Sequence, residues 1–283
     1  MVKGTPEVLL DGLVFPEGPR WHEGKLWFSD MNAYEVVTVD LDGHRETVAK
    51  VPQWPPGLGF LPDGRLLVVS MADRKLLRLD PGRLTEAADM SALASFCNDM
   101  VVDKEGRAYV GDMGSNPFAD EPRRKGSLLL VTPEAGSRVA ADDIEGPNGT
   151  VITLDGRTLI LAETRKRRLL AFDIEADGSL SNRRVWAQLD GPPDGICLDA
   201  EGCVWVGVLS SPGAFVRVVE GGEIKDRIDL AERHAIACML GGPQRRTLFM
   251  LEAFEGGRAA ESRGPGNGRI SVVEVEVPGA GLP

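Results

Sequence analysis

The chain has 283 residues, of which 42% are hydrophobic and 27% are charged, and its formal net charge is −11. This composition is typical of a soluble globular protein with a large core. The negative charge argues against a nucleic-acid partner, because such binding depends on cationic contacts to phosphate. No stretch reaches the roughly 18 apolar residues of a membrane span, and the N-terminus lacks the apolar run of a signal peptide. We expect a cytoplasmic protein, monomeric or weakly self-associating, that binds neither nucleic acid nor membranes.

The cysteines are expected to be free thiols that fill small apolar spaces. None forms a Cys-x-x-Cys pair, and only three histidines are present to complete a Cys/His site. A structural zinc site is therefore not predicted. The four residues are Cys97, Cys197, Cys203 and Cys238.

One sequence phrase recurs along the chain: a polar start, an apolar run, a turn with glycine and a second apolar run. A further apolar run follows each copy, rich in β-branched residues and bounded by Gly, Pro or Asp, which is typical of strands. No long stretch shows the 3.6-residue apolar period of a helix. The copies are 17–31, 57–71, 98–113, 148–163, 194–209 and, more loosely, 235–252.

Four short strands in each unit of 40–50 residues, repeated six times, are typical of a β-propeller. We predict an all-β protein, a single six-bladed β-propeller domain over residues 1–283, with a β-sandwich as the alternative. The last strand, 269–277, is expected to close the ring beside N-terminal residues. The expected blades are roughly 14–50, 51–92, 93–140, 141–188, 189–230 and 231–278.

Position in the repeat predicts the face on which a residue lies. The first strand of each blade lines the central channel. The hairpin turn that ends this strand therefore lies at one mouth of the channel, and the residue that begins the strand lies at the other mouth. Six residues therefore converge on one axis: Glu17, Gly57, Asn98, Asn148, Asp194 and Ala235. Asn or Asp before Gly is also an ordinary turn signal, but each blade already has a hairpin turn elsewhere.

Two carboxylates and two amides packed together would repel or stay unsatisfied without a cation. We therefore predict one divalent metal ion at this mouth. Oxygen donors favour Ca²⁺, with Mg²⁺, Mn²⁺ and Zn²⁺ as alternatives.

Four segments of the repeat stand out as motifs: FPEGPRW, SFCNDMVVDKEGRAYVGD, GPNGTVITLDGRTLILAE and GPPDGICLDAEGCVWVG. They resemble the motifs of the senescence marker protein (regucalcin)/gluconolactonase/luciferin-regenerating enzyme family. The resemblance runs in order through nearly the whole chain, and it implies a six-bladed propeller with a catalytic divalent cation on its axis. It implies Glu17, Asn148 and Asp194 as metal ligands, and Asn98 either in the metal shell or on substrate and water.

The chain departs from the sugar-lactone members of that family at two positions. Phe96 stands where those members carry an arginine that holds substrate hydroxyls, and Asn116 roughly meets a glutamate of the following loop. Both changes argue against a sugar polyol as substrate. Phe96, Trp54 and Met71 suggest a less polar pocket, unless they are packing residues.

The second strands end at the same mouth and supply further candidates for substrate binding or an extended metal shell. Asp112 is one of four such acids, the others being Asp30, Glu163 and Glu252, and all could instead pair with rim cations. His234 precedes the sixth axial position, where it is either a base, a substrate ligand or a structural histidine.

Other charged and glycine-rich segments are expected to lie in solvent. The cluster TRKRRLL at 164–170 is interpreted as a solvated turn, and His22 and His44 lie near turns. The segment 262–269 is expected to be a loop, and the tail from 278 to be disordered.

The resemblance implies hydrolysis of a small-molecule lactone or ester. A bound cation would polarise the carbonyl, Asp194 would act as general base on water, and Glu17 would be a fixed ligand. No G-x-S-x-G motif indicates a serine nucleophile. The alternatives are an organophosphate hydrolase of the fluorophosphatase type and a calcium-binding propeller without catalysis.

Overall fold

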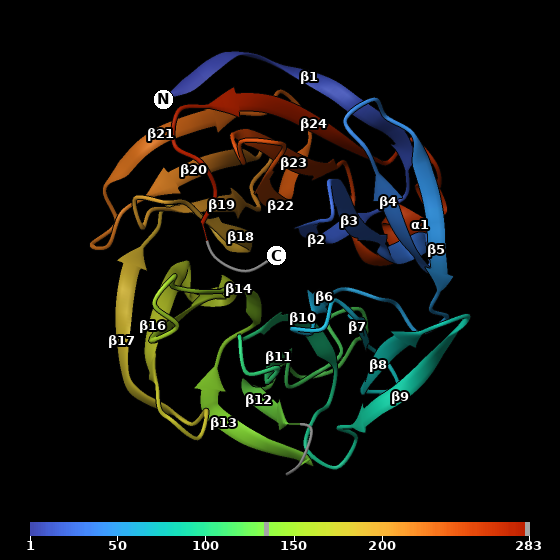
Figure 1. Ribbon diagram of the computed structural model, residues 1–283, viewed down its shortest axis with the longest axis vertical. Helices are drawn as coiled ribbons and strands as arrows, with labels where there is room; N and C mark the ends of the chain where they lie inside the picture. Colours follow the sequence, from blue (N-terminus) through green and yellow to red (C-terminus); the bar gives the residue numbers. More distant parts are fainter. Residues whose placement is uncertain (133–135, 281–283) are drawn as a thin grey trace.

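The computed structural model describes residues 1–132 and 136–280. Six four-stranded antiparallel sheets surround a central axis like the blades of a fan (Figure 1). This arrangement confirms the six-bladed β-propeller predicted from the repeat.

Five blades are built from four consecutive strands, the first of which lies innermost (Figure 1). The strands of the first two blades are β2 (Pro16–His22), β3 (Lys25–Asp30), β4 (Glu35–Val39) and β5 (Arg45–Lys50), then β6 (Leu58–Phe60), β7 (Leu66–Ser70), β8 (Lys75–Asp80) and β9 (Arg83–Asp89). Those of the next two are β10 (Cys97–Val102), β11 (Ala108–Asp112), β12 (Gly126–Thr132) and β13 (Gly136–Ile144), then β14 (Pro147–Ile152), β15 (Thr158–Glu163), β16 (Arg168–Ile174) and β17 (Leu180–Gln188). The fifth blade contains β18 (Pro193–Leu198), β19 (Val204–Val208), β20 (Ala214–Val218) and β21 (Ile224–Asp229).

The sixth blade joins the two ends of the chain. It contains β22 (His234–Gly241), β23 (Thr247–Ala253) and β24 (Gly268–Val275), and its outermost strand is β1 (Val2–Leu13). β1 runs antiparallel to β24, with Val2 opposite Val275 and Leu13 opposite Gly268. This pairing closes the ring, so that the sixth sheet has four strands like the others.

Burial falls from the middle of each blade to its rim. Every residue of β19 is buried, because both faces of this strand pack against neighbouring blades. β21, at the outer edge of the same sheet, is mostly exposed and carries the charges of IKDRID. The four cysteines are free and buried, which agrees with the packing role expected for them.

Carboxylates shape the hairpin turns between first and second strands. The Asp103 carboxylate accepts the backbone N–H groups of Glu105 and Arg107 at 3.0 and 2.9 Å. Asp199 accepts those of Glu201 and Cys203 at 2.9 and 3.0 Å. These are Asx turns. Their carboxylates bind backbone N–H groups at the end of the first strand that lies opposite to its axial residue.

The segments outside the sheets differ from expectation at two places. The helix α1 (Gly257–Arg263) includes the start of the segment 262–269 that was expected to be a loop. Residues 278–280 are ordered, because Ala200 N donates to Pro278 O at 2.8 Å and Ala280 N to Leu198 O at 3.0 Å. The rest of the expected disordered tail, 281–283, lies outside the described residues.

Two 3-10 turns complete the described secondary structure, η1 (Met31–Ala33) and η2 (Thr164–Lys166). Within the described ranges no helix is long and apolar enough to cross a membrane.

Candidate metal centre and substrate pocket

The axial residues lie at irregularities that recur in the innermost strands. The innermost strands β2, β10, β14 and β18 each contain one residue more than the partner strand between two paired positions. In β10, for example, Cys97 pairs with Asp112 and Met100 with Val110. Such a bulge bends the strand and redirects a side chain. Glu17 begins the irregular segment of its strand, and Asn98, Asn148 and Asp194 lie inside theirs.

Glycine after the axial residue allows neighbouring blades to approach closely. A Cβ atom on Gly149 would lie 2.6 Å from both Asp194 O and Ile196 N of the next blade. Gly18 has a φ of +54°, and a Cβ there would lie 2.5 Å from Pro56 O. The Asn-Gly and Glu-Gly pairs therefore fix the spacing of the strands that carry the ligands.

The four polar axial residues come together as predicted and line one cavity of about 230 Å³. Glu17, Asn98 and Asp194 are buried, and Asn148 is half-buried. The Asn98 amide nitrogen donates to Pro147 O at 3.1 Å, which leaves its amide oxygen for a ligand. We call Glu17, Asn98, Asn148 and Asp194 the axial cup.

The electrostatics of the axial cup favour a cation. Burial and the negative charges of Asp194 and Asp99 raise the pKa of Glu17 well above its usual value. Burial and the charge of Asp99 raise the pKa of Asp194 in the same way, opposed by a hydrogen bond from Asn148. A divalent ion would relieve both effects, because it favours the ionised carboxylates.

A buried ion pair beneath the axial cup was not anticipated from the sequence. Arg20 Nη2 lies 3.2 Å from Asp99 Oδ1, and both side chains are buried. Burial raises the pKa of Asp99, and the Arg20 guanidinium opposes that rise. The sequence contained one sign of this pair: Arg20 is a cation three residues after the axial residue Glu17. The three other blades of the axial cup have Val101, Val151 and Cys197 at this position.

The donors of the axial cup match a hard cation. Two carboxylates and two amides supply only oxygen to the ion, which suits Ca²⁺ and, with fewer ligands, Mg²⁺ or Mn²⁺. The group Asp40, Asp42 and His44 also lies within ligand distance, but Asp40 accepts the backbone N–H groups of the other two at 2.9 Å. That group is an exposed hairpin turn.

The acids that end the second strands bind the loops that precede the axial positions. Asp30 accepts Phe15 N at 2.7 Å, and Asp112 accepts Phe96 N at 2.9 Å. Glu163 likewise accepts Glu145 N at 2.8 Å. Glu252 pairs instead with Arg269 at 2.8 Å.

Three other candidates lie outside the cavity lining. Asn116 shapes its own loop, because its Oδ1 accepts Phe118 N at 2.9 Å. His234 is half-buried, with Nδ1 2.8 Å from Ser210 O. Phe96 lies behind Phe118, with ring centroids 6.0 Å apart, so it contributes to the aromatic wall rather than touching the cavity.

The mouth of the cavity has an apolar wall. Trp54 packs against Phe96 and Phe118, with ring centroids 6.2 and 5.8 Å apart. The apolar side chains that line the cavity itself are Phe15, Met31, Met71, Met113, Pro117, Phe118 and Leu209. Thus Met71 lines the cavity, while Trp54 supports its wall.

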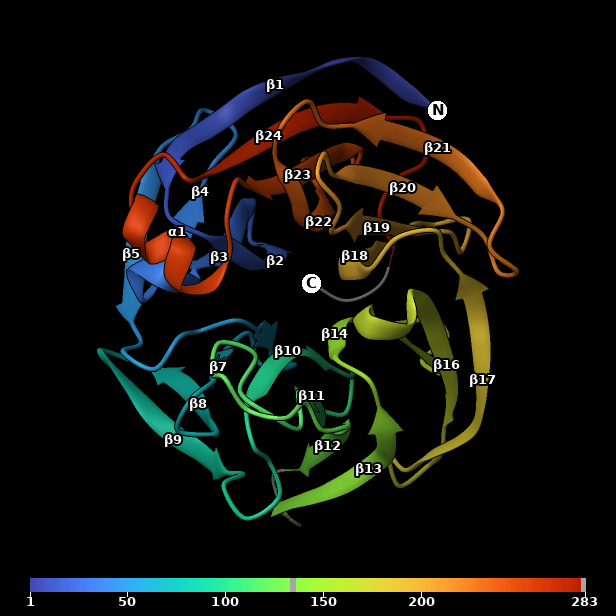
Figure 2. The ribbon, with the colours of Figure 1, turned by 180° about the vertical axis from the view of Figure 1, so that it is seen from behind.

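Helix α1 lies over the first blade, beside β4 and β5, on the face of the propeller that Figure 2 shows. Its first residue, Gly257, lines the cavity. Glu261 accepts hydrogen bonds from Tyr34 Oη at 2.7 Å and Trp54 Nε1 at 3.0 Å. These contacts attach α1 of the sixth blade to the first and second blades.

The interpretation of the cluster 164–170 as a solvated turn is wrong at both ends of the turn. Residues 168–170 already belong to β16, where Leu169 and Leu170 are buried. Arg165 is half-buried and lines the cavity, because η2 ends in a left-handed residue, Arg167, that turns the chain back into β16. The neighbouring cations are engaged elsewhere, Lys166 with Glu145 at 2.9 Å and Arg168 with Glu163 at 2.5 Å.

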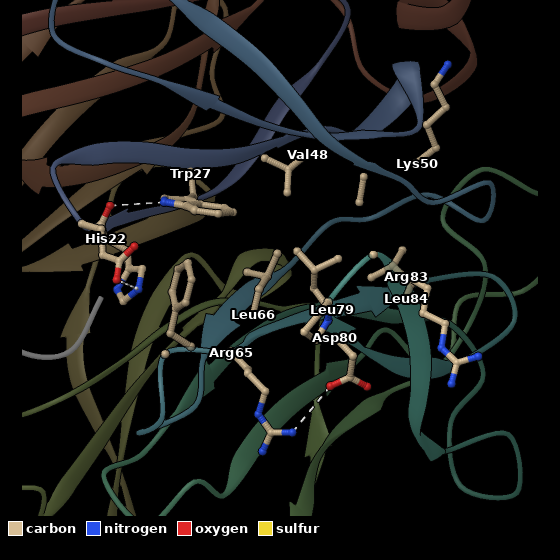
Figure 3. A pocket seen from close by; sticks show the side chains of 16 residues that line it. His22, Trp27, Val48, Lys50, Arg65, Leu66, Leu79, Asp80, Arg83 and Leu84 are labelled. Atoms are coloured by element: carbon tan, nitrogen blue, oxygen red, sulfur yellow. Dashed lines mark hydrogen bonds and ion pairs between the residues drawn. The ribbon is translucent and has the colours of Figure 1, made fainter.

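A larger cavity, of about 680 Å³, lies between the first two blades (Figure 3). Two of its charged groups, Arg65 and Asp80, pair with each other at 3.6 Å. His22, expected in solvent, stacks on Phe60 with ring centroids 3.8 Å apart, and burial lowers its pKa. The side chains that line this larger cavity do not bring several oxygen ligands together. The axial cup is therefore the candidate site because of its ligands, although its cavity is smaller.

A family model described as "SMP-30/Gluconolactonase/LRE-like region" matches residues 15–254. The chain belongs to this family. The match includes all four residues of the axial cup and confirms the resemblance derived from the motifs.

Relatives of the family cover nearly the whole chain. A 6-deoxy-6-sulfogluconolactonase of Pseudomonas putida is 26% identical over 95% of this chain and 94% of its own. The regucalcin of Xenopus laevis is 29% identical over 85% of this chain and 83% of its own. A solved structure of a calcium-binding protein, regucalcin, from Agrobacterium tumefaciens has a TM-score of 0.82 and 24% identity, covering 99% of this chain and 96% of that one.

Proposed function

We propose that the protein is a divalent-metal-dependent hydrolase that opens a lactone. The observation that carries the proposal is the convergence of two buried carboxylates and two amides at the floor of a cavity that can admit a small molecule. The names of relatives support it, since one is a sulfogluconolactonase and one solved structure is described as a calcium-binding protein.

Glu17, Asn148 and Asp194 would hold the ion, with Asn98 either on the ion or on substrate and water. A cation bound there would polarise the lactone carbonyl and acidify a water molecule. Ca²⁺ is the favoured ion because all the protein ligands are oxygens.

Asp194 is the residue that we assign as general base. Its carboxylate takes a proton from water as the water oxygen bonds to the carbonyl carbon. The ring C–O bond then breaks, and the protonated Asp194 returns its proton to the ring oxygen, which becomes a hydroxyl group. The product is a hydroxy acid, and Asp194 is again a carboxylate. Glu17 would stay ionised as a ligand of the cation, and the backbone hydrogen bond from Gly18 N at 2.9 Å holds its Oε2.

The cavity above the axial cup favours a hydrolase over a simple calcium buffer. A buffer needs only the ligands, whereas here apolar side chains such as Met71, Met113 and Phe118 line a space beside them. An organophosphate would meet the same ligands, so it belongs in the assay as the competing substrate class.

The test is proton release from aliphatic, aromatic and sugar lactones and from an organophosphate, measured with chelator and after adding each divalent ion. We expect lactone hydrolysis that chelator abolishes, that Ca²⁺ restores, and that Asp194→Asn lacks. Asp190→Asn is the matched control, because Asp190 is an exposed carboxylate four residues earlier. Full activity in the chelated protein would contradict the proposal.

A further inference from the structure

One charged side chain of the cavity has no carboxylate partner. The guanidinium of Arg165 donates through Nη1 to Arg124 O at 3.2 Å, and within residues 1–132 and 136–280 no ion pair joins it to an acid. Glu145 is paired with Lys166, and Glu163 with Arg168. Arg165 lines the cavity, and among the described residues only one of its five N–H donors has an acceptor at hydrogen-bond distance.

An unpaired, half-buried cation is costly to the folded protein. Burial and the nearby positive charge of Arg123 lower the pKa of Arg165, and the negative charge of Glu145 offsets them only in part. The guanidinium nevertheless stays charged at neutral pH. Buried cations are normally paired with an acid. An anion that enters the cavity would supply that partner and could accept a two-point contact.

The rest of the cavity offers few groups to a polyhydroxylated substrate. Its walls are methionine, phenylalanine, proline and leucine side chains above the axial cup. The hydroxyl of Thr164 is directed to Pro193 O at 2.7 Å, so it is engaged with the backbone. The remaining chemistry fits a hydrocarbon body that carries one acidic group.

We propose that Arg165 is a specificity-determining residue that binds the acidic group of a lactone whose body is otherwise apolar. The inference rests on the proposed function, because it assumes that the lactone carbonyl lies over the axial cup. In this arrangement the apolar walls of the cavity contact the body of the lactone, and Arg165 binds its anionic group.

Two matched probes isolate the acidic group. They are γ-valerolactone and the same ring with a carboxylate in place of the γ-methyl group. For the Ca²⁺-loaded protein we expect a higher kcat/KM on the carboxylate probe. Arg165→Met should reduce that value about 10- to 100-fold, because charge-assisted hydrogen bonds are lost, with most of the change in KM since the contact is remote from the reacting atoms. The value for γ-valerolactone should change less than about 2-fold.

Lys166→Met is the control variant, because it removes one positive charge from an adjacent residue that lies outside the cavity lining. It should preserve the preference for the carboxylate probe. An equal loss on both probes in Arg165→Met, or the same loss of preference in Lys166→Met, would overturn the inference.

Binding of the non-hydrolysable acid tetrahydrofuroate, measured by calorimetry in chelator, separates this inference from the proposed function. Binding that requires Arg165 without any lactone hydrolysis would refute the hydrolase and retain the anion site. Lactone hydrolysis without Arg165-dependent binding of this acid would retain the hydrolase and refute the anion site. An anion that binds only when Ca²⁺ is present, and equally in Arg165→Met, would also overturn the inference, since the ion would then be its partner.

Discussion

Replacing Asp194 by asparagine should change the metal-free and metal-bound proteins in opposite directions. In the metal-free protein, burial and the charge of Asp99 raise the pKa of Asp194. Each unit of that rise costs about 1.4 kcal/mol of folding free energy at a pH above both pKa values. Asp194→Asn removes this cost, so the melting temperature in chelator should rise by about 2–4 °C for each kcal/mol recovered.

The same substitution should weaken cation binding. Removing one buried charge from a buried, compensated set costs roughly 3–5 kcal/mol, which corresponds to an increase in Kd of about 10²- to 10⁴-fold. Scanning calorimetry with chelator and with Ca²⁺ gives the first effect, and titration calorimetry gives the second.

Asp190→Asn should leave both quantities unchanged, because that side chain is exposed. A lower melting temperature of Asp194→Asn in chelator would refute the reasoning. It would mean that the hydrogen bond from Asn148 to Asp194 outweighs burial and repulsion.

Three further predictions concern pH, packing and the far face. Because the pKa values of Glu17 and Asp194 are raised in the folded protein above 4.5 and 3.8, the native state retains protons that the unfolded state loses. The melting temperature in chelator should therefore fall as the pH rises from these values through the folded pKa values, and saturating Ca²⁺ should flatten the curve. Gly149→Ala should raise the Kd for Ca²⁺ by roughly 10- to 100-fold, because its Cβ would lie 2.6 Å from Asp194 O. Arg217→Met should destabilise the fold by roughly 3–5 kcal/mol, because Asp199, 2.6 Å away, loses its partner, while calorimetric Ca²⁺ affinity stays unchanged.

Each of these has a contrary outcome. A chelated protein whose stability does not vary with pH would show that the axial carboxylates ionise normally. Unchanged Ca²⁺ affinity in Gly149→Ala would show that the strand spacing is not rigid. If the Asp199→Asn, Arg217→Met double variant were no more stable than Arg217→Met, the uncompensated charge of Asp199 would not be the cause.

The sequence was sufficient for features that repeat. The recurrence of apolar runs and turn glycines predicts six sheets because each copy must form the same hairpins. Position within a copy then separates Asp194, at the axial cup, from Asp199, in the turn at the other end of β18. Both are aspartates, five positions apart, and their places in the repeat distinguish them.

Features that occur in only one blade could not be predicted in this way. Arg165 belongs to a run of cations, and only the turn geometry of η2 separates it from Lys166. The position of α1 depends on Glu261 meeting Tyr34 and Trp54, which are 227 and 207 residues away. The pair of Arg20 with Asp99 spans 79 residues, and no local pattern encodes it.

The closure of the ring sets an order of events during synthesis. Asn267, just before β24, donates a hydrogen bond to Val14 O, just after β1, so that this bond joins positions 253 residues apart. At a translation rate of roughly 5–20 residues per second, β1 is finished about 13–50 s before its partner β24 exists. Most side chains of β1 are exposed even in the finished blade, so the waiting strand presents little apolar surface to other chains. The strands of the first five blades are consecutive in the chain, whereas the sixth blade is completed only after β24 has been made.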